Sequence, residues 1–344
     1  MFQYFLLFFF INTFIIFIVS KFNTKNLFLD RVDKKHAIHD FKVFKLGGLL
    51  VFLNLILFIV LEFNALPSNL FIFFIFALAV SSIGIFEDYK STDKFTWRLF
   101  LILIISTYFV ISNSFFINNL NLGLNLIDNL YNSNNYIKIL VTIFCINTVI
   151  HSFNFIDGVN GNLNIYILSI LTSIFIVLNL EKIFIFEFKI IFEILLYLVI
   201  SLFFFNYPKP LIFMGDGGAY FFGALVSTFV ILLSINISYD NISIWYYANL
   251  MIFPFTEMFI SFFRRIFFNK KKPTTADNKH LHHLILNILK NKIFFVDKSK
   301  NILNSSVALI SLIIYFPTIL FSTLFYNNEI ILKYIFYTSF IFFI

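Results

Sequence analysis

Acidic, basic and histidine side chains of this chain gather in five short loops that separate long apolar stretches. These loops span Asp33–His39, Glu87–Lys90, His151–Gly161, Phe213–Tyr220 and Arg264–His283. A carboxylate or imidazole beside an apolar stretch loses solvation unless it meets a cation, water or a substrate. The residue types therefore favour binding of a metal ion and an anion over a purely structural use.

The fourth loop is the best candidate for a metal site. It places Asp216 among glycines, directly before an apolar stretch. Such a loop leaves room for a cation, which a carboxylate binds, and for a diphosphate, which the N-terminus of the following helix favours. An ordinary tight turn would also explain the glycines alone. In the second loop, a bound magnesium ion or a role as base would explain the adjacent Glu87 and Asp88, and so would a pair of carboxylates solvated at a helix end near Lys90.

The third loop carries two polar residues at helical spacing. Asn154 and Asp157 are three positions apart, so the end of a helix would present both on one face. Gly158 and Gly161 allow the chain to turn sharply just beyond. Turn formation explains the glycines, but it does not explain the companion His151 and Asn154.

The first and fifth loops are basic and suit an anionic substrate. Lys34, Lys35 and His36 could hold a phosphate, or they could simply contact lipid headgroups. The fifth loop ends with His280, His282 and His283. Their spacing differs from the usual zinc pattern and their neighbours are basic, so binding of a diphosphate is favoured over zinc. Nucleic acid is not expected as a partner, because nothing in the chain resembles a groove-reading fold.

The elements that position these loops must be membrane helices. The chain has 344 residues and is 60% hydrophobic, with only 25 Lys and Arg and 18 Asp and Glu, which is too little charge to cover a water-soluble globule. We expect an all-α integral membrane protein, a single domain over residues 1–344 with ten or eleven spans. The predicted spans are 2–20, 43–63, 69–86, 97–117, 136–151, 163–180, 187–205, 218–239, 243–267, 303–326 and 329–344.

The basic residues predict the orientation of these spans. All Lys and Arg residues except Lys138, Lys182, Lys189 and Lys333 lie on the side of the five loops. The positive-inside rule places that side in the cytoplasm and the N-terminus outside. The first span is expected to be retained, because it lacks the basic start and cleavage site of a signal peptide.

In their order and spacing, the five loops together resemble the bacterial polyprenyl-phosphate N-acetylhexosamine-1-phosphate transferases, the family of WecA-like and MraY-like enzymes. The resemblance extends from Asp33 to His283, and the His-Leu-His-His ending is similar to the WecA side. Two positions depart from the family pattern. Glu87 replaces the first of two aspartates, and His151 replaces an asparagine.

The resemblance implies transfer of N-acetylhexosamine-1-phosphate from a UDP-sugar to undecaprenyl phosphate, at the cytoplasmic face of a bacterial inner membrane. It implies a magnesium ion, which manganese could replace, on Asp216, and the start of O-antigen or another surface polysaccharide. Catalytic roles fall on Glu87, Asp88 and Asp157, and substrate binding falls on Lys34, Lys35, His36, Asn154, His280, His282 and His283. A homodimer is compatible with this assignment.

Two other functions are weighed against this one. A phospho-N-acetylmuramoyl-pentapeptide transferase belongs to the same family, but the His-Leu-His-His ending and Glu87 disfavour it. A polytopic transporter would place its charged residues near the middle of the bilayer, whereas here they lie at one face. An intramembrane zinc hydrolase is disfavoured because the sequence has no His-Glu-x-x-His pattern.

Overall fold

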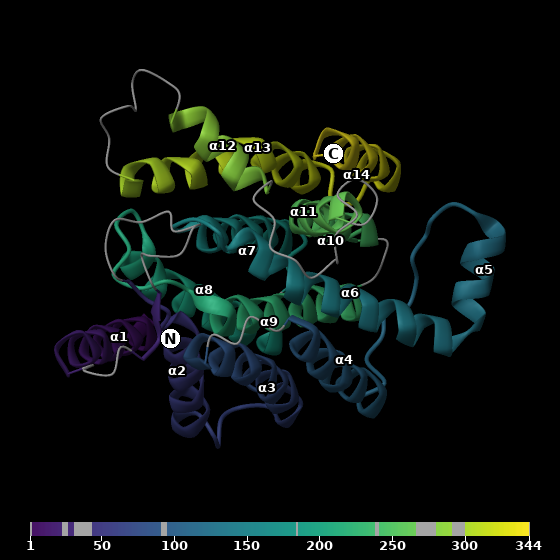
Figure 1. The fold of residues 1–344 in the computed structure, drawn as a ribbon. Coiled ribbons are helices and arrows are strands. Elements are labelled where there is room, and N and C mark those ends of the chain that lie inside the picture. The colour runs from purple at the N-terminus through teal and green to yellow at the C-terminus, as the bar shows by residue number, and fades with distance from the viewer. Residues whose placement is uncertain are drawn as a thin grey trace.

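A computed structural model describes residues 2–22, 27–30, 43–90, 95–183, 185–237, 241–265, 280–290 and 300–343. Within these ranges the chain is a bundle of helices (Figure 1). The long apolar helices are α1 (Phe2–Phe22), α2 (Gly47–Leu61), α3 (Ser68–Lys90), α4 (Phe95–Ser112), α6 (Asn135–Ile156), α7 (Asn162–Leu180), α8 (Phe186–Asn206), α9 (Gly215–Asn236), α13 (Lys300–Leu324) and α14 (Glu329–Phe343). Eight of these described helices, all except the shorter α2 and α14, are long and apolar enough to cross a membrane, which confirms the all-α polytopic fold.

One predicted span is broken. Residues 243–267 form two helices, α10 (Ile244–Leu250) and α11 (Ile252–Phe263), on either side of Met251. Pro254 explains the break, because proline cannot donate to the carbonyl of Leu250 and its ring crowds that carbonyl. The hydroxyl of Tyr166 donates to the carbonyl of Leu250 instead, so the freed acceptor is satisfied.

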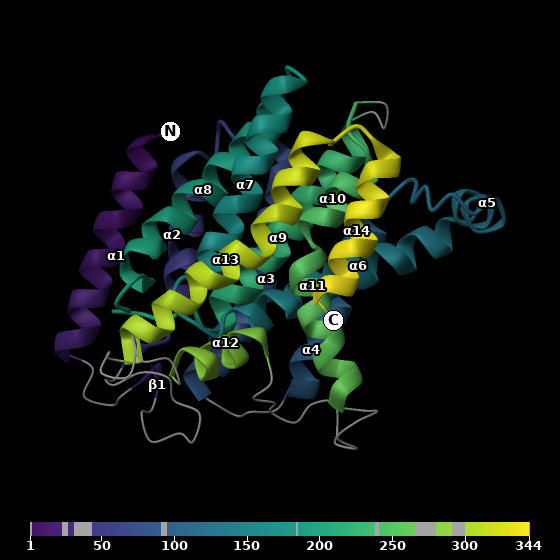
Figure 2. The ribbon, with the colours of Figure 1, turned by 90° about the horizontal axis from the view of Figure 1, so that it is seen from above.

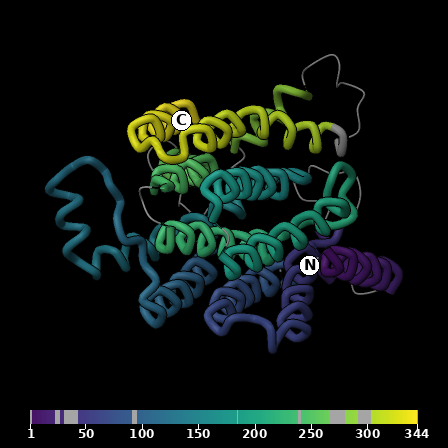
Figure 3. The backbone as a smooth tube through the Cα atoms, turned by 180° about the vertical axis from the view of Figure 1, so that it is seen from behind, coloured from purple at the N-terminus to yellow at the C-terminus, as the bar shows by residue number. Residues whose placement is uncertain are grey.

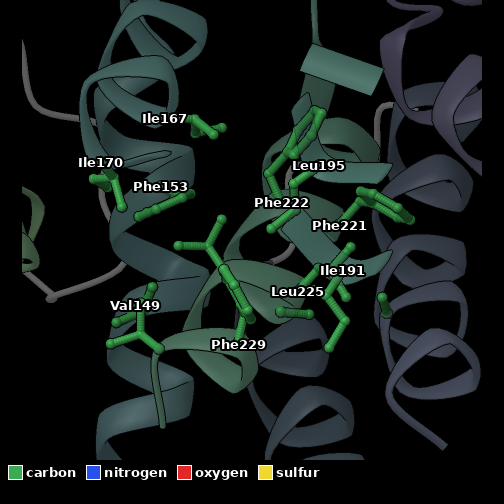
Figure 4. Close-up of a cluster of buried hydrophobic side chains, with 14 of the residues drawn as sticks. Val149, Phe153, Ile167, Ile170, Ile191, Leu195, Phe221, Phe222, Leu225 and Phe229 are labelled. Carbon is green, nitrogen blue, oxygen red and sulfur yellow. The ribbon is translucent and has the colours of Figure 1, made fainter. Parts of the chain in front are cut away.

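Helix α9 lies at the centre of the bundle. Figures 1 and 3 show α1–α4 on one side of it and α12–α14 on the opposite side. Aliphatic and aromatic side chains of α6, α7, α8 and α9 interlock around it (Figure 4), among them Phe153, Ile170, Leu195 and Phe222. Gly223 allows close contact with α6, since a Cβ there would lie 2.7 Å from the Cα atom of Ile150.

The loops contain further elements that the hydropathy pattern does not predict. Helix α5 (Asn125–Ser133) lies between α4 and α6, and α12 (Leu281–Lys290) follows the start of the histidine run. Strands β1 (Leu29–Asp30) and β2 (Val43–Phe44) pair antiparallel, and Phe44 bridges to Ile212. This ribbon connects the first loop to the segment that leads into α9. We call the end of the bundle that carries this ribbon the site end, and the opposite end the far end.

Candidate active site

A polar cavity of about 250 Å³ lies at the site end, in front of the N-terminus of α9. Carboxylates, one lysine and several amides face it. Its polar side chains are those of Asp30, Lys45, Asn154, Asp157, Asn160, Asn206, Asp216 and Asn304. The third and fourth loops, far apart in the sequence, therefore meet in one cavity, as their residue types predict.

Close backbone packing positions the start of α9. A Cβ on Gly48 would lie 2.6 Å from the Cα of Gly217, and a Cβ on Gly84 would lie 2.5 Å from the carbonyl carbon of Asp216. Gly215 has a φ of +70°, a conformation that side chains disfavour. Only glycine fits these positions, so α2 and α3 hold the first turn of α9 firmly in place.

Asp88 caps the first turn of α9. Its Oδ1 accepts the backbone N–H of Asp216 at 3.1 Å, and its Oδ2 accepts the N–H of Gly217 at 2.9 Å. A carboxylate there satisfies donors that a helix leaves unpaired and interacts favourably with the helix dipole. Asp88 is buried, and it fixes the turn that carries Asp216.

Asp216 is held from two sides. The amide of Asn154 donates to Oδ1 at 2.7 Å, and the guanidinium of Arg98 pairs with Oδ2. Arg98 lies at the start of α4 and is only 9% exposed. The carboxylate therefore has a fixed orientation toward the cavity and a buried counter-charge behind it.

Asp157 and Lys45 both line this cavity, and the charge of Lys45 acts on the carboxyl group of Asp157. Burial, and after it the carboxylates of Asp216 and Asp88, raises the pKa of Asp157 well above its ordinary value, although Lys45 opposes this. Burial would lower the pKa of Lys45, but the carboxylates of Asp88, Asp30 and Asp216 outweigh burial and raise it. Lys45 also lies 3.6 Å from Oδ1 of Asp30. An acidic cavity of this kind favours a bound cation.

Amides form another wall of the cavity. The N–H of Gly161 donates to Asn206 Oδ1 at 2.6 Å, and the N–H of Asn160 donates to Asn304 Oδ1 at 2.8 Å. The side chain of Asn160 is 2% exposed, and within the described part of the chain neither of its polar atoms has a hydrogen-bond partner. Unsatisfied buried amides of this kind are costly, so this wall is suited to an uncharged polar group.

The histidine run packs beside the third loop without facing the cavity. A Cβ on Gly158 would lie 2.2 Å from His282 Nε2, so the imidazole rests directly on this glycine. The His280 and His282 rings are stacked with centroids 5.5 Å apart, and His280 Nδ1 lies 3.0 Å from the Ser261 hydroxyl. Burial, and after it the neighbouring His283 and His280, lowers the pKa of His282 well below its ordinary value.

The predicted site residues are thus only partly brought together. Asn154, Asp157 and Asp216 face the cavity, Asp88 supports it, and the histidines flank it. Glu87 is buried next to Asp88 but does not face the cavity. The prediction for Lys34, Lys35 and His36 lies outside the described residues.

Several residues of the site are not singled out by the sequence alone. In the sequence, Arg98 and Lys45 serve only as basic residues that predict the orientation of the spans in the membrane. Asp30 and Asn206 belong to none of the motifs. A weak signal exists for two of them. Arg98 lies inside the predicted start of an apolar span, where a charge needs a partner, and Lys45 stands close before the Gly47-Gly48 pair.

His151 occupies a buried position one turn before Asn154. Its ring packs edge-on against Tyr220 at a centroid distance of 5.6 Å and lies 5.5 Å from Phe95. Neither ring nitrogen has a hydrogen-bond partner among the described residues. The ring thus fills space between α4, α6 and α9 behind the cavity.

The donor set fits magnesium better than zinc. Within the described ranges, no three His, Cys, Asp or Glu side chains group closely enough to hold a metal by themselves. Magnesium commonly uses one or two carboxylates and completes its shell with water and substrate phosphates. Asp216, with Asp157 across the same cavity, provides such a partial set.

Two comparisons with known proteins bear on this cavity. Residues 70–234 match the model of Glycosyl transferase family 4. The chain is 24% identical over 275 residues to the undecaprenyl-phosphate alpha-N-acetylglucosaminyl 1-phosphate transferase of Thermotoga maritima, across 80% of this chain and 78% of that relative. Both comparisons support a resemblance to glycosyl transferase family 4. The resemblance of the five loops is therefore confirmed.

The family 4 match extends from α3 nearly to the end of α9. It includes the acidic pair, Arg98, the third loop and the Asp216 loop. Lys45 and the histidine run lie outside the matched residues. The matched segment therefore contains the buried carboxylates, and the flanking segments add a lysine and imidazoles around them.

Proposed function

We propose that this protein transfers N-acetylhexosamine-1-phosphate from a UDP-sugar to undecaprenyl phosphate and releases UMP. The observation that carries the proposal is the acidic cavity before α9, with Asp216 held by Asn154 and Arg98, in a chain that matches the family 4 model. The activity for which the Thermotoga relative is named supports this reaction class and makes N-acetylglucosamine the first sugar to test. We expect the reaction on the cytoplasmic side of a bacterial inner membrane, because the basic residues near the cavity favour that orientation.

The charge of the cavity supports a need for a divalent cation. Asp30, Asp157 and Asp216 face it, and Lys45 is the basic residue among the lining residues that the structure describes. A diphosphate entering this cavity would be repelled unless a cation lay between it and the carboxylates. Magnesium on Asp216 would supply that positive charge and offset the charge that develops on the leaving UMP.

The acceptor needs little activation by a base. A phosphate monoester with a second pKa of about 6 is mostly dianionic at neutral pH, so its oxygen can attack directly. It attacks the phosphorus linked to the sugar, and the bond from that phosphorus to the bridging oxygen breaks as UMP leaves with that oxygen. Asp88 is better suited to orient Asp216 than to move protons, because both its oxygens already accept backbone N–H groups.

The donor has two candidate contact surfaces. In the amide wall, Asn206 and Asn304 bond to the backbone of the third loop, and the side chain of Asn160 suits an uncharged hydrogen-bonding group of the nucleoside or the sugar. His282 rests on Gly158, which lines the polar cavity, so a side-chain movement would bring this imidazole toward a bound diphosphate. We assign His280, His282 and His283 to that role, and Lys34, Lys35 and His36 to a substrate phosphate.

The polyprenyl chain requires an apolar surface that continues from the polar cavity. A second cavity, also of about 250 Å³, lies between α6, α9, α10, α11 and α14, and none of the described residues in its lining is charged. Its walls include Val149, Val230, Tyr247, Phe255 and Phe336. We assign this apolar cavity to a distal part of the acceptor chain.

The test is a transfer assay on the purified protein in membranes. Undecaprenyl phosphate, magnesium and a panel of UDP-N-acetylhexosamines are supplied, and UMP and the lipid product are followed by mass spectrometry. A magnesium-dependent lipid diphosphosugar from one donor is the expected result. Asp216→Asn should lower turnover by at least about a hundredfold, while Glu187→Gln, in the first turn of α8 and remote from the polar cavity, should leave it unchanged.

Two outcomes would contradict the proposal. Turnover only with UDP-N-acetylmuramoyl-pentapeptide would assign the protein to peptidoglycan synthesis instead. No turnover with any donor, from protein that still unfolds cooperatively, would reject the reaction. The role in starting O-antigen or another surface polysaccharide is tested by whether deletion of the gene removes that glycan.

A further inference from the structure

Helix α5 lies outside the bundle. It contacts α6, and in Figures 1 and 3 it stands apart from the other helices at one side. In Figure 2 it is seen nearly end-on, whereas the long helices run along the page. The helix ends at Ser133 and α6 begins at Asn135, at the far end of the bundle. It therefore lies across the direction of the spans, next to the end of α6 that is remote from the polar cavity.

One face of α5 is apolar and exposed. Leu126 is 85% exposed, Leu130 is 58% exposed and Ile127 is 49% exposed. These side chains occupy one side of the helix, and its other side carries Asn125, Asp128, Asn129 and Asn132. A helix of this pattern is stable at a boundary between an apolar medium and water.

The segment around α5 is held firmly. The hydroxyl of Tyr131 donates to the carbonyl of Ile117 at 2.8 Å, and Trp245 Nε1 donates to the carbonyl of Asn121 at 2.9 Å. Asp128 accepts the N–H groups of Leu122 and Gly123, each at 2.9 Å. The apolar face is thus presented in a fixed direction.

The surroundings identify what covers this face. Tyr136, Leu140 and Phe144, on the outward side of α6, are 80%, 66% and 61% exposed, and α6 is a membrane span, so these side chains face lipid. Because α6 begins two residues after α5 ends, this lipid-facing surface starts next to α5. Residues 113–137 contain no Lys or Arg, so neutral acyl chains fit better than anionic headgroups.

We propose that α5 is an interfacial helix whose Leu126, Ile127 and Leu130 lie among the acyl chains of the far-side leaflet. A second copy of the chain is a weaker occupant, because three side chains on a nine-residue helix bury too little area for a stable dimer. The same segment supplies Ile117 and Leu120 to the wall of the apolar cavity. Anchoring α5 in lipid therefore also fixes one wall of that cavity.

The experiment compares the two faces of α5 with a fluorescent probe. In a Cys145→Ser background, which removes the only cysteine, Leu130→Cys and Asn132→Cys are each labelled with an environment-sensitive dye. The full-length protein is placed in phosphatidylcholine nanodiscs, with or without lipid that carries a doxyl quencher near its headgroup. Iodide in the buffer quenches dyes that face water.

The two positions should respond in opposite ways. We expect the dye at Leu130 to be quenched by doxyl lipid and protected from iodide, and the dye at Asn132 to be quenched mainly by iodide. Iodide quenching at both positions would overturn the proposal, because the helix would then lie in water. Protection of Leu130 from both quenchers would also overturn it and indicate a protein partner, which cross-linking through Leu130→Cys would then identify as a second copy or another protein.

Discussion

Arg98 and Asp216 form a partly buried ion pair although they lie on different helices, α4 and α9. Arg98 thus already neutralises the charge of Asp216. A divalent ion on Asp216 must therefore share the carboxylate with Arg98 or displace it. Removing this charge should make the site more attractive to a cation.

We expect Arg98→Gln to tighten Mn²⁺ binding. A unit charge about 4 Å from a carboxylate contributes roughly 4 kcal/mol at an effective dielectric constant near 20, so a gain of at least about tenfold is expected. Electron paramagnetic resonance of free Mn²⁺ measures the affinity without substrates. Arg98→Lys keeps the charge and serves as the control. Weaker binding by Arg98→Gln would mean that Arg98 mainly holds Asp216 in a ligating position.

His282 predicts a pH dependence of stability. The pKa of His282 is lowered in the folded protein, so the unfolded chain binds a proton there more readily. The folded protein therefore keeps its full stability above the unfolded-state pKa of about 6.5 and loses stability as the pH falls below it. At pH 5.5, one unit lower, the loss can reach about 1.4 kcal/mol. Thermal unfolding of wild type and His282→Asn between pH 7.5 and 5.5 measures it, since the variant should lose less stability than the wild type. Parallel pH profiles of the two proteins would contradict this assignment.

At the scale of elements, glycines decide where Asp216 lies. Gly84 on α3 contacts the backbone of Asp216, whereas Ser82, two residues earlier, is exposed. Gly84→Ala should therefore cost about 1–3 kcal/mol through overpacking and weaken Mn²⁺ binding, because α9 must shift. Ser82→Ala is the matched control and should leave both unchanged. Thermal unfolding and the Mn²⁺ measurement test the pair, and a Gly84→Ala variant with normal values would show that α3 and α9 separate easily.

Hydropathy locates the long helices but does not fully describe the elements. The apolar stretch 243–267 has the length of one span, yet Pro254 divides it into α10 and α11. Hydropathy does not predict helix α5, because its apolar residues alternate with asparagines at helical spacing and leave no continuous apolar stretch. Local composition thus finds long apolar helices well and short amphipathic ones poorly.

At the scale of the whole molecule, the polar and apolar cavities lie on the same central helix. Asp216 is at the start of α9, and Val230 and Ser234 near its other end line the apolar cavity. A long polyprenyl acceptor would therefore reach from the polar cavity into the apolar cavity, and a short one would occupy the polar cavity alone.

Filling the apolar cavity tests this arrangement. Ala248→Phe places a larger side chain in its wall and should raise KM for undecaprenyl phosphate several-fold, while a short-chain polyprenyl phosphate keeps its KM. Initial rates of UMP release with the two acceptors measure the difference, and Leu309→Phe, at an exposed position on α13, is the control. Equal effects on both acceptors would mean that the polyprenyl chain does not bind in the apolar cavity.

By itself, the sequence determined the membrane class, the side on which the charges lie and the residue types of the site, because composition, apolar length and loop motifs are local properties. Asn154, Asp157 and Asp216 are predicted to share a site, and they face one cavity. Only the tertiary structure decided that Arg98 pairs with Asp216 and that Asp88 caps the helix that carries it. Those contacts join residues more than a hundred positions apart, and they depend on how closely α2, α3 and α4 approach α9. That approach depends on side-chain volume at the crossing points, which no local pattern records.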